Sequence, residues 1–188
     1  MEKPAICVFC GSSFGADPAF RDAARAIGAG IADLGFRLVF GGGGLGLMGE
    51  VAKAALAGGS EVQGIMPGFL QALEPAISPQ EKLTITPHLQ ERKLLMLQMA
   101  DAFLALPGGL GTFDELFEVL TEAQLGVHAK PIIVVNVNGY FDALDAQLHA
   151  IVEKGFAREM ILKLYYLANG PEDALKILEG ALNAPPAA

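Results

Sequence analysis

Residues 102–115 read AFLALPGGLGTFDE, an apolar run followed directly by a glycine-rich turn. The first five residues have the length and apolar character of a buried strand. The turn, PGGLGT, precedes a stretch that we predict to be a helix over residues 112–125. This strand–turn–helix unit decides the architecture, because the same order of elements recurs along the chain.

Predicted strands alternate with predicted helices throughout. The strands fall at residues 5–10, 36–40, 61–66, 82–86, 102–106, 131–136 and 164–167, and the helices at 18–34, 47–57, 89–100, 112–125, 141–154 and 171–182. Continuous apolar strands such as AICVF and IIVV indicate a parallel sheet that helices cover on both faces. We therefore predict one Rossmann-like, doubly wound α/β domain over residues 1–183, with a disordered tail at 184–188.

The composition predicts a large core and an acidic surface. Of 188 residues, 52% are hydrophobic, the mean hydropathy is +0.41, the net charge is −8 and the pI is about 4.8. Nucleic-acid binders usually carry a basic face, so we expect no nucleic-acid partner, although a few local cations suffice to hold one phosphate. No apolar run reaches the roughly 18 residues of a membrane span, and no secretory signal is recognisable, so we expect a cytoplasmic protein without a membrane partner.

The two cysteines, Cys7 and Cys10, form a C-x-x-C pattern that is compatible with redox chemistry or half a zinc site. Both fall in or next to the first predicted strand, where positions 7 and 10 point to opposite faces. There is no second cysteine pair, and the three histidines are scattered. We therefore expect two free core thiols in a reducing compartment and no metal site.

Three glycine-containing segments follow predicted strands, at residues 10–13 (CGSS), 41–49 (GGGGLGLMG) and 107–112 (PGGLGT). The carboxyl ends of parallel strands meet at one edge of the sheet, where such folds bind ligands. Glycine lets backbone N–H groups approach a ligand, and a following helix adds its positive end. We expect the three segments to form one ligand site.

The segment at 41–49 matches G-x-G-x-x-G twice. A dinucleotide site would also need an acidic residue at the end of the next strand, but that strand ends in Met66 and Glu61 lies at its start. A P-loop needs Lys and Ser/Thr after its last glycine, whereas Gly49 is followed by Glu-Val. We expect no nicotinamide cofactor, and a tight turn with close helix–sheet packing is the alternative interpretation of this segment.

The segment at 107–115 leaves two interpretations of Glu115 open. Thr112 and Glu115 have the T-x-x-E spacing of a capping box, which is a purely structural role. However, Asp114 and Glu115 put two carboxylates in one helical turn at the ligand edge. A carboxylate there would repel a phosphate unless it had another role, which favours catalysis.

Two basic residues, Arg92 and Lys93, fall in the first turns of the predicted helix at 89–100, which begins at the same edge. A solvated helix start is one interpretation. Basic residues in a first turn oppose the helix dipole, however, so an anion or Glu115 lying opposite them is the better explanation. Arginine suits bidentate contact with a carboxylate or a phosphate.

With these motifs together, the sequence resembles the LOG family of cytokinin riboside 5′-monophosphate phosphoribohydrolases, formerly labelled lysine decarboxylases. The resemblance covers about residues 6–155. Its markers are PGG-x-GT-x-x-E at 107–115 and the Arg92-Lys93 pair upstream. Lesser matches are VFCGSS, FGGGGLGLMG, LTEAQLG and KPIIVVNVNGYF.

The resemblance implies hydrolysis of the N-glycosidic bond of AMP or an N6-substituted AMP, without a metal or organic cofactor, by a homodimer with sites near the interface. It implies that Arg92 and Glu115 are catalytic. The residues that it places in substrate binding are Glu74, Lys93, Gly109, Leu110, Gly111, Thr112 and Thr121. At the same edge of the sheet we add the candidates Ser12, Gly43, Gly44 and Gly108.

The chain departs from the family pattern at positions that bear on substrate preference. Leu89 and Gln90 stand where the family usually has Met and His, Glu122 stands where it often has Trp, and Gly44 stands where it usually has Ser.

Two alternatives to hydrolysis are open from the sequence. One is a nucleotide or molybdenum-cofactor carrier of the same fold. The other is a lysine decarboxylase, which needs a lysine that forms a Schiff base with pyridoxal phosphate. No candidate for that lysine stands out among Lys53, Lys93 and Lys130.

Overall fold

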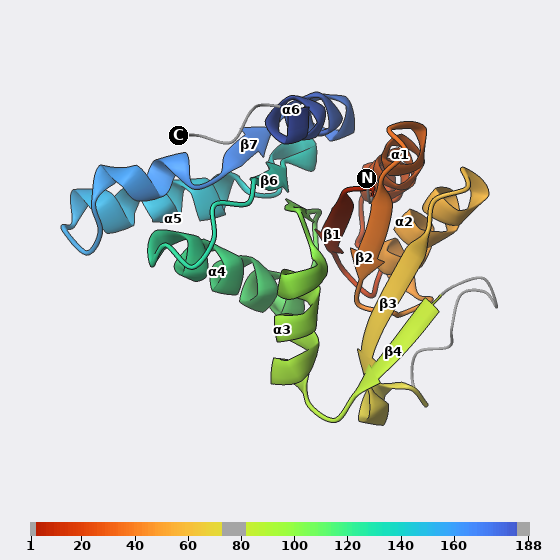
Figure 1. Cartoon of the computed structure of the whole chain (residues 1–188). Helices are drawn as coiled ribbons and strands as arrows, with labels where there is room; N and C mark the ends of the chain where they lie inside the picture. The colour runs from red at the N-terminus through yellow and green to blue at the C-terminus, as the bar shows by residue number, and fades with distance from the viewer. Residues whose placement is uncertain (1–2, 73–81, 184–188) are drawn as a thin grey trace.

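The computed structural model describes residues 3–72 and 82–183 and shows strands and helices in strict alternation over most of the chain (Figure 1). The strands are β1 (Ala5–Phe9), β2 (Arg37–Phe40), β3 (Val62–Pro67), β4 (Lys82–Thr86), β5 (Ala102–Ala105), β6 (Ile132–Val135) and β7 (Tyr166–Ala168). The helices are α1 (Pro18–Asp33), α2 (Gly46–Ala57), α3 (Leu89–Met99), α4 (Leu110–Gln124), α5 (Asp142–Glu153) and α6 (Pro171–Asn183). Short 3-10 turns are η1 (Gly68–Leu70), η2 (Val137–Gly139) and η3 (Glu159–Lys163).

The seven strands form one parallel sheet in the order β4-β3-β2-β1-β5-β6-β7. The strand order reverses between β1 and β5, where Val8 of β1 is paired with Phe40 on one side and with Leu104 on the other. This topology is doubly wound and confirms the predicted Rossmann-like class. Ligands of such folds bind beyond the carboxyl ends of the strands at this reversal.

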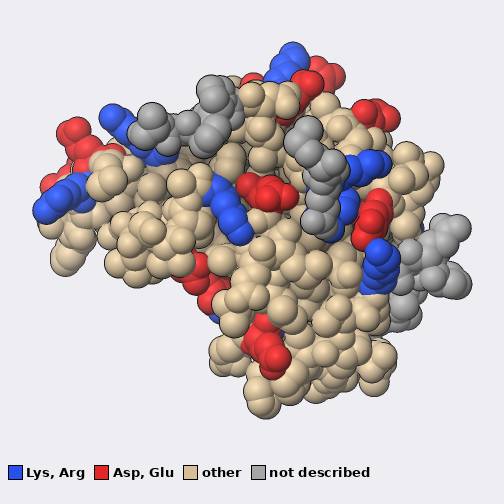
Figure 2. Space-filling view, in the orientation of Figure 1, with Lys and Arg blue, Asp and Glu red and all other residues tan. Residues whose placement is uncertain are grey.

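Charges of both signs are spread over the surface. Figure 2 shows basic and acidic side chains interspersed on the visible face, with no broad basic area. In the part of the chain that the structure describes, no helix is long and apolar enough to cross a membrane.

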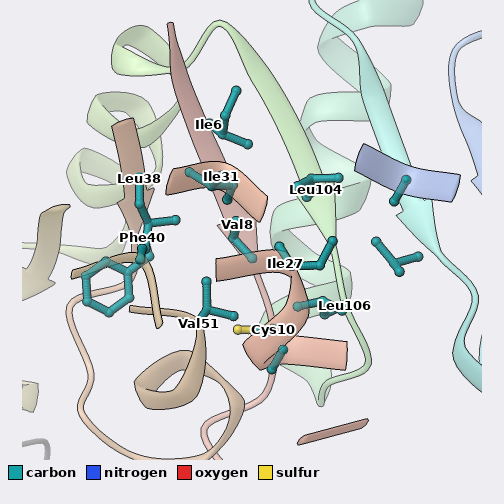
Figure 3. Packing of buried hydrophobic residues seen from close by; sticks show 14 of the residues in the cluster. Ile6, Val8, Cys10, Ile27, Ile31, Leu38, Phe40, Val51, Leu104 and Leu106 are labelled. Atoms are coloured by element: carbon teal, nitrogen blue, oxygen red, sulfur yellow. The ribbon is translucent and has the colours of Figure 1, made fainter. Parts of the chain in front are cut away.

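The sheet separates two apolar cores, as the period of two along each strand requires. Ile6, Val8 and Cys10 pack against α1, α2 and α6, and Figure 3 shows this core from close by. Cys7 and Phe9 pack into the other core, beneath α3, α4 and α5. The two cysteines are buried and free on opposite faces, as predicted.

Local sequence signals set the start of α1. Asp17 caps α1, its side chain accepting a hydrogen bond from the N–H of Ala19 at 2.9 Å, and Pro18 occupies the first turn. Glu74 and the tail at 184–188 lie outside the described residues.

Candidate active site

A pocket of about 330 Å³ lies beyond the carboxyl ends of the central strands. It is lined by Cys10, Gly11, Ser12, Gly41, Met48, Leu70, Leu89, Arg92, Gly109, Leu110, Gly111, Thr112 and Glu115. All three glycine-containing segments therefore contribute to one hollow, together with the start of α3. A larger hollow of 580 Å³ lies over α1 and α2, away from the strand ends, and gathers none of these segments.

Arg92 and Glu115 form an ion pair in this pocket. Nη2 of Arg92 lies 3.0 Å from Oε1 of Glu115, and the two side chains are only 13% and 9% exposed. Nε of Arg92 also donates to the carbonyl of Ile65 at 3.1 Å, which holds the guanidinium from β3. The anion expected opposite the basic start of α3 is thus Glu115, from the neighbouring helix α4.

Gly41 makes room for this arginine. A β-carbon at position 41 would lie 2.3 Å from Nη2 of Arg92, far inside van der Waals contact. Because glycine has no β-carbon, the guanidinium can lie against the end of β2 and pair with Glu115.

Burial raises the pKa of the Glu115 carboxyl from 4.5 to about 6, although the charge of Arg92 acts to lower it. At pH 7 the group is therefore mostly a carboxylate, yet it can take up a proton at little free-energy cost. This is the behaviour of a general base.

Helix α4 begins earlier than the T-x-x-E spacing predicts, so the capping-box interpretation of Glu115 is wrong. The N-cap is Gly109, without a side-chain cap, and Thr112 lies inside the first turn. Glu115 therefore cannot reach back to an N-cap formed by Thr112, and it pairs with Arg92 instead. The physical reason is that the glycine turn closes directly into the helix, with Thr112 and Phe113 donating to the carbonyl of Gly109.

The first turn of α4 presents unpaired donors. Among the described residues, the N–H groups of Leu110 and Gly111 have no hydrogen-bond partner. Both residues line the pocket, and the positive end of the helix dipole adds to their attraction for an anion. This turn has the properties of a phosphate site.

The N-terminus of α2 is not free in the same way. The N–H groups of Leu47 and Met48 both donate to the carbonyl of Gly11, at 3.0 and 3.2 Å. Gly46 has a φ of +57°, and a β-carbon there would lie 2.2 Å from the carbonyl carbon of Ser12. The glycine run thus provides the tight turn and close packing that were the alternative interpretation.

The predicted substrate-binding residues divide into those at the pocket and those away from it. The pocket brings together Ser12, Gly109, Leu110, Gly111 and Thr112 with the Arg92–Glu115 pair. Gly108 packs closely against this group, since a β-carbon there would lie 2.1 Å from Oγ1 of Thr112. Gly43 and Gly44 are not among the lining residues.

Lys93 and Thr121 also lie away from the pocket lining. Nζ of Lys93 is 3.0 Å from carboxylate oxygens of both Asp114 and Glu118, on the flank of α4. Thr121 is exposed on α4, about 13 Å along the helix axis from Thr112.

Six lining residues were not named individually as site residues from the sequence. Cys10, Gly11, Gly41 and Met48 lie in the glycine-containing segments that were expected to form the site, Leu89 was noted only as a departure from the family pattern, and Leu70 lies outside these segments. Gly41 belongs to the glycine run, but its neighbour across the pocket, Arg92, is distant in sequence. Leu70 follows a strand in a segment without any pattern typical of a site.

The sheet order, the unpaired first turn of α4 and the buried acid–arginine pair define a class: a doubly wound α/β protein with a pocket suited to an anion at the reversal of its sheet. The comparisons with known proteins then place the chain within this class. A family model described as possible lysine decarboxylase matches residues 48–178. The chain is 40% identical over 174 residues to cytokinin riboside 5′-monophosphate phosphoribohydrolase LOG7 of Arabidopsis thaliana, covering 93% of this chain and 80% of that protein.

A second relative is cytokinin riboside 5′-monophosphate phosphoribohydrolase LOG of Oryza sativa subsp. japonica. It is 41% identical in an alignment 173 positions long that covers 85% of this chain and 72% of the relative. The chain therefore belongs to the LOG family, as its motifs predicted.

Solved structures share the fold at lower identity. The molybdenum cofactor binding protein of Rippkaea orientalis matches with a TM-score of 0.74 at 24% identity, over 97% of this chain and 99% of that one. The Moco carrier protein of Chlamydomonas reinhardtii matches with a TM-score of 0.74 at 22% identity, over 96% and 98%. At these identities the likeness confirms the fold alone.

Proposed function

We propose that this protein hydrolyses the N-glycosidic bond of AMP or an N6-substituted AMP, releasing the free base and ribose 5-phosphate. The observation that carries the proposal is the buried Arg92–Glu115 pair, which shares one pocket with the unpaired N–H groups of α4. The relatives named for this reaction on cytokinin riboside 5′-monophosphates support it.

The phosphate is assigned to the turn between β5 and α4. The N–H groups of Gly109, Leu110 and Gly111, with the hydroxyl of Thr112, surround this end of the pocket. Holding the phosphate there leaves the ribose to extend toward Glu115, so that the turn orients the bond to be broken.

Glu115 acts on the ribose carbon. As the C1′–N9 bond breaks, its electron pair goes to the base and positive charge develops at C1′, which a carboxylate stabilises. A water oxygen then bonds to C1′ while Glu115 accepts a proton from that water. The proton then passes from Glu115 through solvent to the departing base, which restores the carboxylate. Arg92 keeps the carboxylate oriented and favours its ionised form until it takes up that proton.

The same geometry argues against decarboxylation. Among the described residues, no lysine lines the pocket. Lys93 is held by Asp114 and Glu118, and Nζ of Lys130 donates to the carbonyl of Leu97 at 2.7 Å. Neither amine is placed to form a Schiff base there.

A homodimer is part of the proposal. Leu110, Phe117 and Thr121 recur at helical spacing on one face of α4, and Leu110 is 90% exposed. Leu125, the C-cap of the helix, is exposed as well. A second copy of the chain on this face would cover the apolar side chains and bring its own surface to the pocket mouth and to Thr121.

The buried free thiols fit a reducing compartment, and we place the activity in the cytoplasm.

Product analysis with AMP and isopentenyl-AMP side by side tests the function. We expect free base and ribose 5-phosphate from at least one of them. Binding of either nucleotide without release of base would identify a carrier instead. An absorbance scan of concentrated protein that revealed a bound pyridoxal chromophore would identify a decarboxylase.

A further inference from the structure

The turn that we assign to the phosphate is held by hydrogen bonds from two neighbouring loops. Two consecutive carbonyl groups of the turn accept these bonds. The carbonyl of Pro107 accepts a hydrogen bond from the N–H of Gly11, at the end of β1, at 3.1 Å. The carbonyl of Gly108 accepts one from the hydroxyl of Tyr140, in the loop between β6 and α5. Tyr140 does not line the Arg92–Glu115 pocket and has no role in the reaction described above.

The position of Tyr140 is itself fixed. Asn138 and Gly139 just before it both have positive φ, at 51° and 74°, and the Asn138 side chain donates to Asp17, the N-cap of α1, at 2.8 Å. The Tyr140 ring packs edge-on against Phe20 of α1, with centroids 5.5 Å apart. The hydroxyl therefore reaches the turn from a rigid support rather than from a mobile loop.

The hydrogen bond at the Gly108 carbonyl also fixes the direction of the N–H group in the same peptide. In a trans peptide the carbonyl and the N–H point in opposite directions, and every peptide bond of the described residues is trans. Gly109 separates two hollows: the Arg92–Glu115 pocket and a smaller one of about 180 Å³, which Tyr140 and Gly108 line. With the Gly108 carbonyl held on the Tyr140 side, the Gly109 N–H is directed toward the other side, where the nucleotide phosphate would lie.

This contact supplies a constraint that the sequence of the turn lacks. Adjacent glycines restrict their shared peptide plane very little, and a β-carbon on Gly109 would meet nothing within 4 Å. Without an anchor, the Gly108–Gly109 plane would sample several orientations, and binding an anion would have to order it.

We propose that Tyr140 is a positioning residue for the phosphate turn, its hydroxyl setting the Gly108–Gly109 peptide plane so that the Gly109 N–H faces the bound phosphate. The proposal rests on the proposed function, because it concerns the same site. It makes the loop after β6 part of the binding site although no atom of that loop touches the substrate.

The test compares Tyr140→Phe with Tyr165→Phe. Tyr140→Phe keeps the ring and removes only the hydroxyl. Tyr165→Phe is the matched control, because its hydroxyl also makes one hydrogen bond, to Asp145 at 2.6 Å, in the region of α5 and away from the pocket. For each variant, KM and kcat are measured for AMP hydrolysis, AMP binding is measured by calorimetry, and ribose 5-phosphate and adenosine are tested as inhibitors.

We expect Tyr140→Phe to raise KM, the dissociation constant of AMP and the inhibition constant of ribose 5-phosphate by about 3- to 10-fold, the effect of one hydrogen bond. Because Arg92 and Glu115 are untouched, kcat should stay within about twofold, and adenosine, which lacks the phosphate, should inhibit as it does the wild type. Tyr165→Phe should change none of these values.

Three results would overturn the proposal: unchanged AMP and ribose 5-phosphate affinity in Tyr140→Phe, an equal loss toward adenosine, or the same losses in Tyr165→Phe. A wild type that binds AMP without hydrolysing it overturns the proposed function alone, since the calorimetric comparison still decides the role of Tyr140. A wild type that binds neither AMP nor inorganic phosphate overturns both.

Discussion

Gly41 and Arg92 are in direct contact at the end of β2, with the guanidinium occupying the space that a side chain at position 41 would need. A β-carbon on Gly41 would lie 2.3 Å from Nη2 and 3.3 Å from Cζ of Arg92. Because the obstructed atoms belong to the far end of a flexible side chain, the conflict can be relieved by moving the arginine. That movement would separate Arg92 from Glu115.

Gly41→Ala should therefore impair activity much more than stability. We expect kcat/KM to fall by about 10- to 100-fold, since a displacement near 1 Å at a catalytic group has effects of this size. The free energy of unfolding should change by no more than about 1 kcal/mol. The control is Gly180→Ala on α6, where a β-carbon meets nothing within 4 Å. A Gly41→Ala enzyme with wild-type kcat/KM would show that the position of Arg92 is not critical.

Glu115→Gln removes the charge and keeps the shape of the side chain. We expect kcat to fall by about 10²- to 10⁴-fold, the usual contribution of a general acid–base group. Glu118→Gln on the same helix is the matched control: it loses one of the two carboxylates around Lys93 and should stay within about twofold of wild type. Wild-type turnover by a folded Glu115→Gln variant would remove Glu115 from the mechanism.

The pH dependence follows from the raised pKa of Glu115, to about 6. Since the carboxylate is the active form, kcat/KM should decline as the pH falls through 6, on a limb that reports the free enzyme. The free energy of unfolding depends on pH in the opposite direction to kcat/KM. The folded protein holds this proton more tightly than the unfolded chain, so the group contributes about 2 kcal/mol below pH 4.5 that is lost as the pH rises through 6. A profile that is flat between pH 5 and pH 7 would contradict the assignment.

Arg92→Gln distinguishes the titration of Glu115 from that of the substrate, because a phosphate monoester also titrates near pH 6. The charge of Arg92 lowers the pKa of the Glu115 carboxyl, so its removal should raise that pKa further and move the acidic limb to higher pH. The substrate titration is independent of the variant. An acidic limb at the same pH in both enzymes would assign it to the substrate.

The sequence predicted the framework of the site because its signals were strong and local. Continuous apolar strands gave the parallel sheet, the strand ends gave the location of the pocket, and the basic start of α3 indicated an opposite charge, which is Glu115. The family motifs then identified the chain correctly as a member of the LOG family.

The finer assignments depended on backbone geometry that residue types do not encode. The T-x-x-E spacing suggested a cap, but the chain turns into α4 at Gly109, before Thr112. Lys93 is adjacent to Arg92 in sequence, yet the helical rotation of about 100° per residue directs it to the flank of α4. The free helix N-terminus belongs to α4 and not to α2, because the carbonyl of Gly11 happens to face α2.

Glu50 provides a test of stability that is separate from the active site. It is a buried carboxylate on α2 that accepts hydrogen bonds from Arg21, at 3.2 Å, and from Arg25, both on α1. The hydrogen bond from Arg21, and to a smaller extent that from Arg25, lowers the pKa of Glu50 below 4.5. The contribution of Glu50 to stability is therefore present above pH 4.5 and is lost as the pH falls through the lowered pKa.

Glu50→Gln should therefore lower the free energy of unfolding at pH 7 by about 1–3 kcal/mol, because a partly buried, charge-assisted contact is weakened while its arginines remain. The difference from wild type should shrink as the pH is lowered toward 3, since protonation neutralises Glu50 in the wild type as well. Asp22→Asn, which alters an exposed carboxylate 3.9 Å from Arg25, should change stability by less than about 0.5 kcal/mol. Denaturant unfolding at pH 3 and pH 7 measures all three proteins. A destabilisation of Glu50→Gln that is equal at both pH values would show that packing, and not the two arginine contacts, accounts for the effect of Glu50.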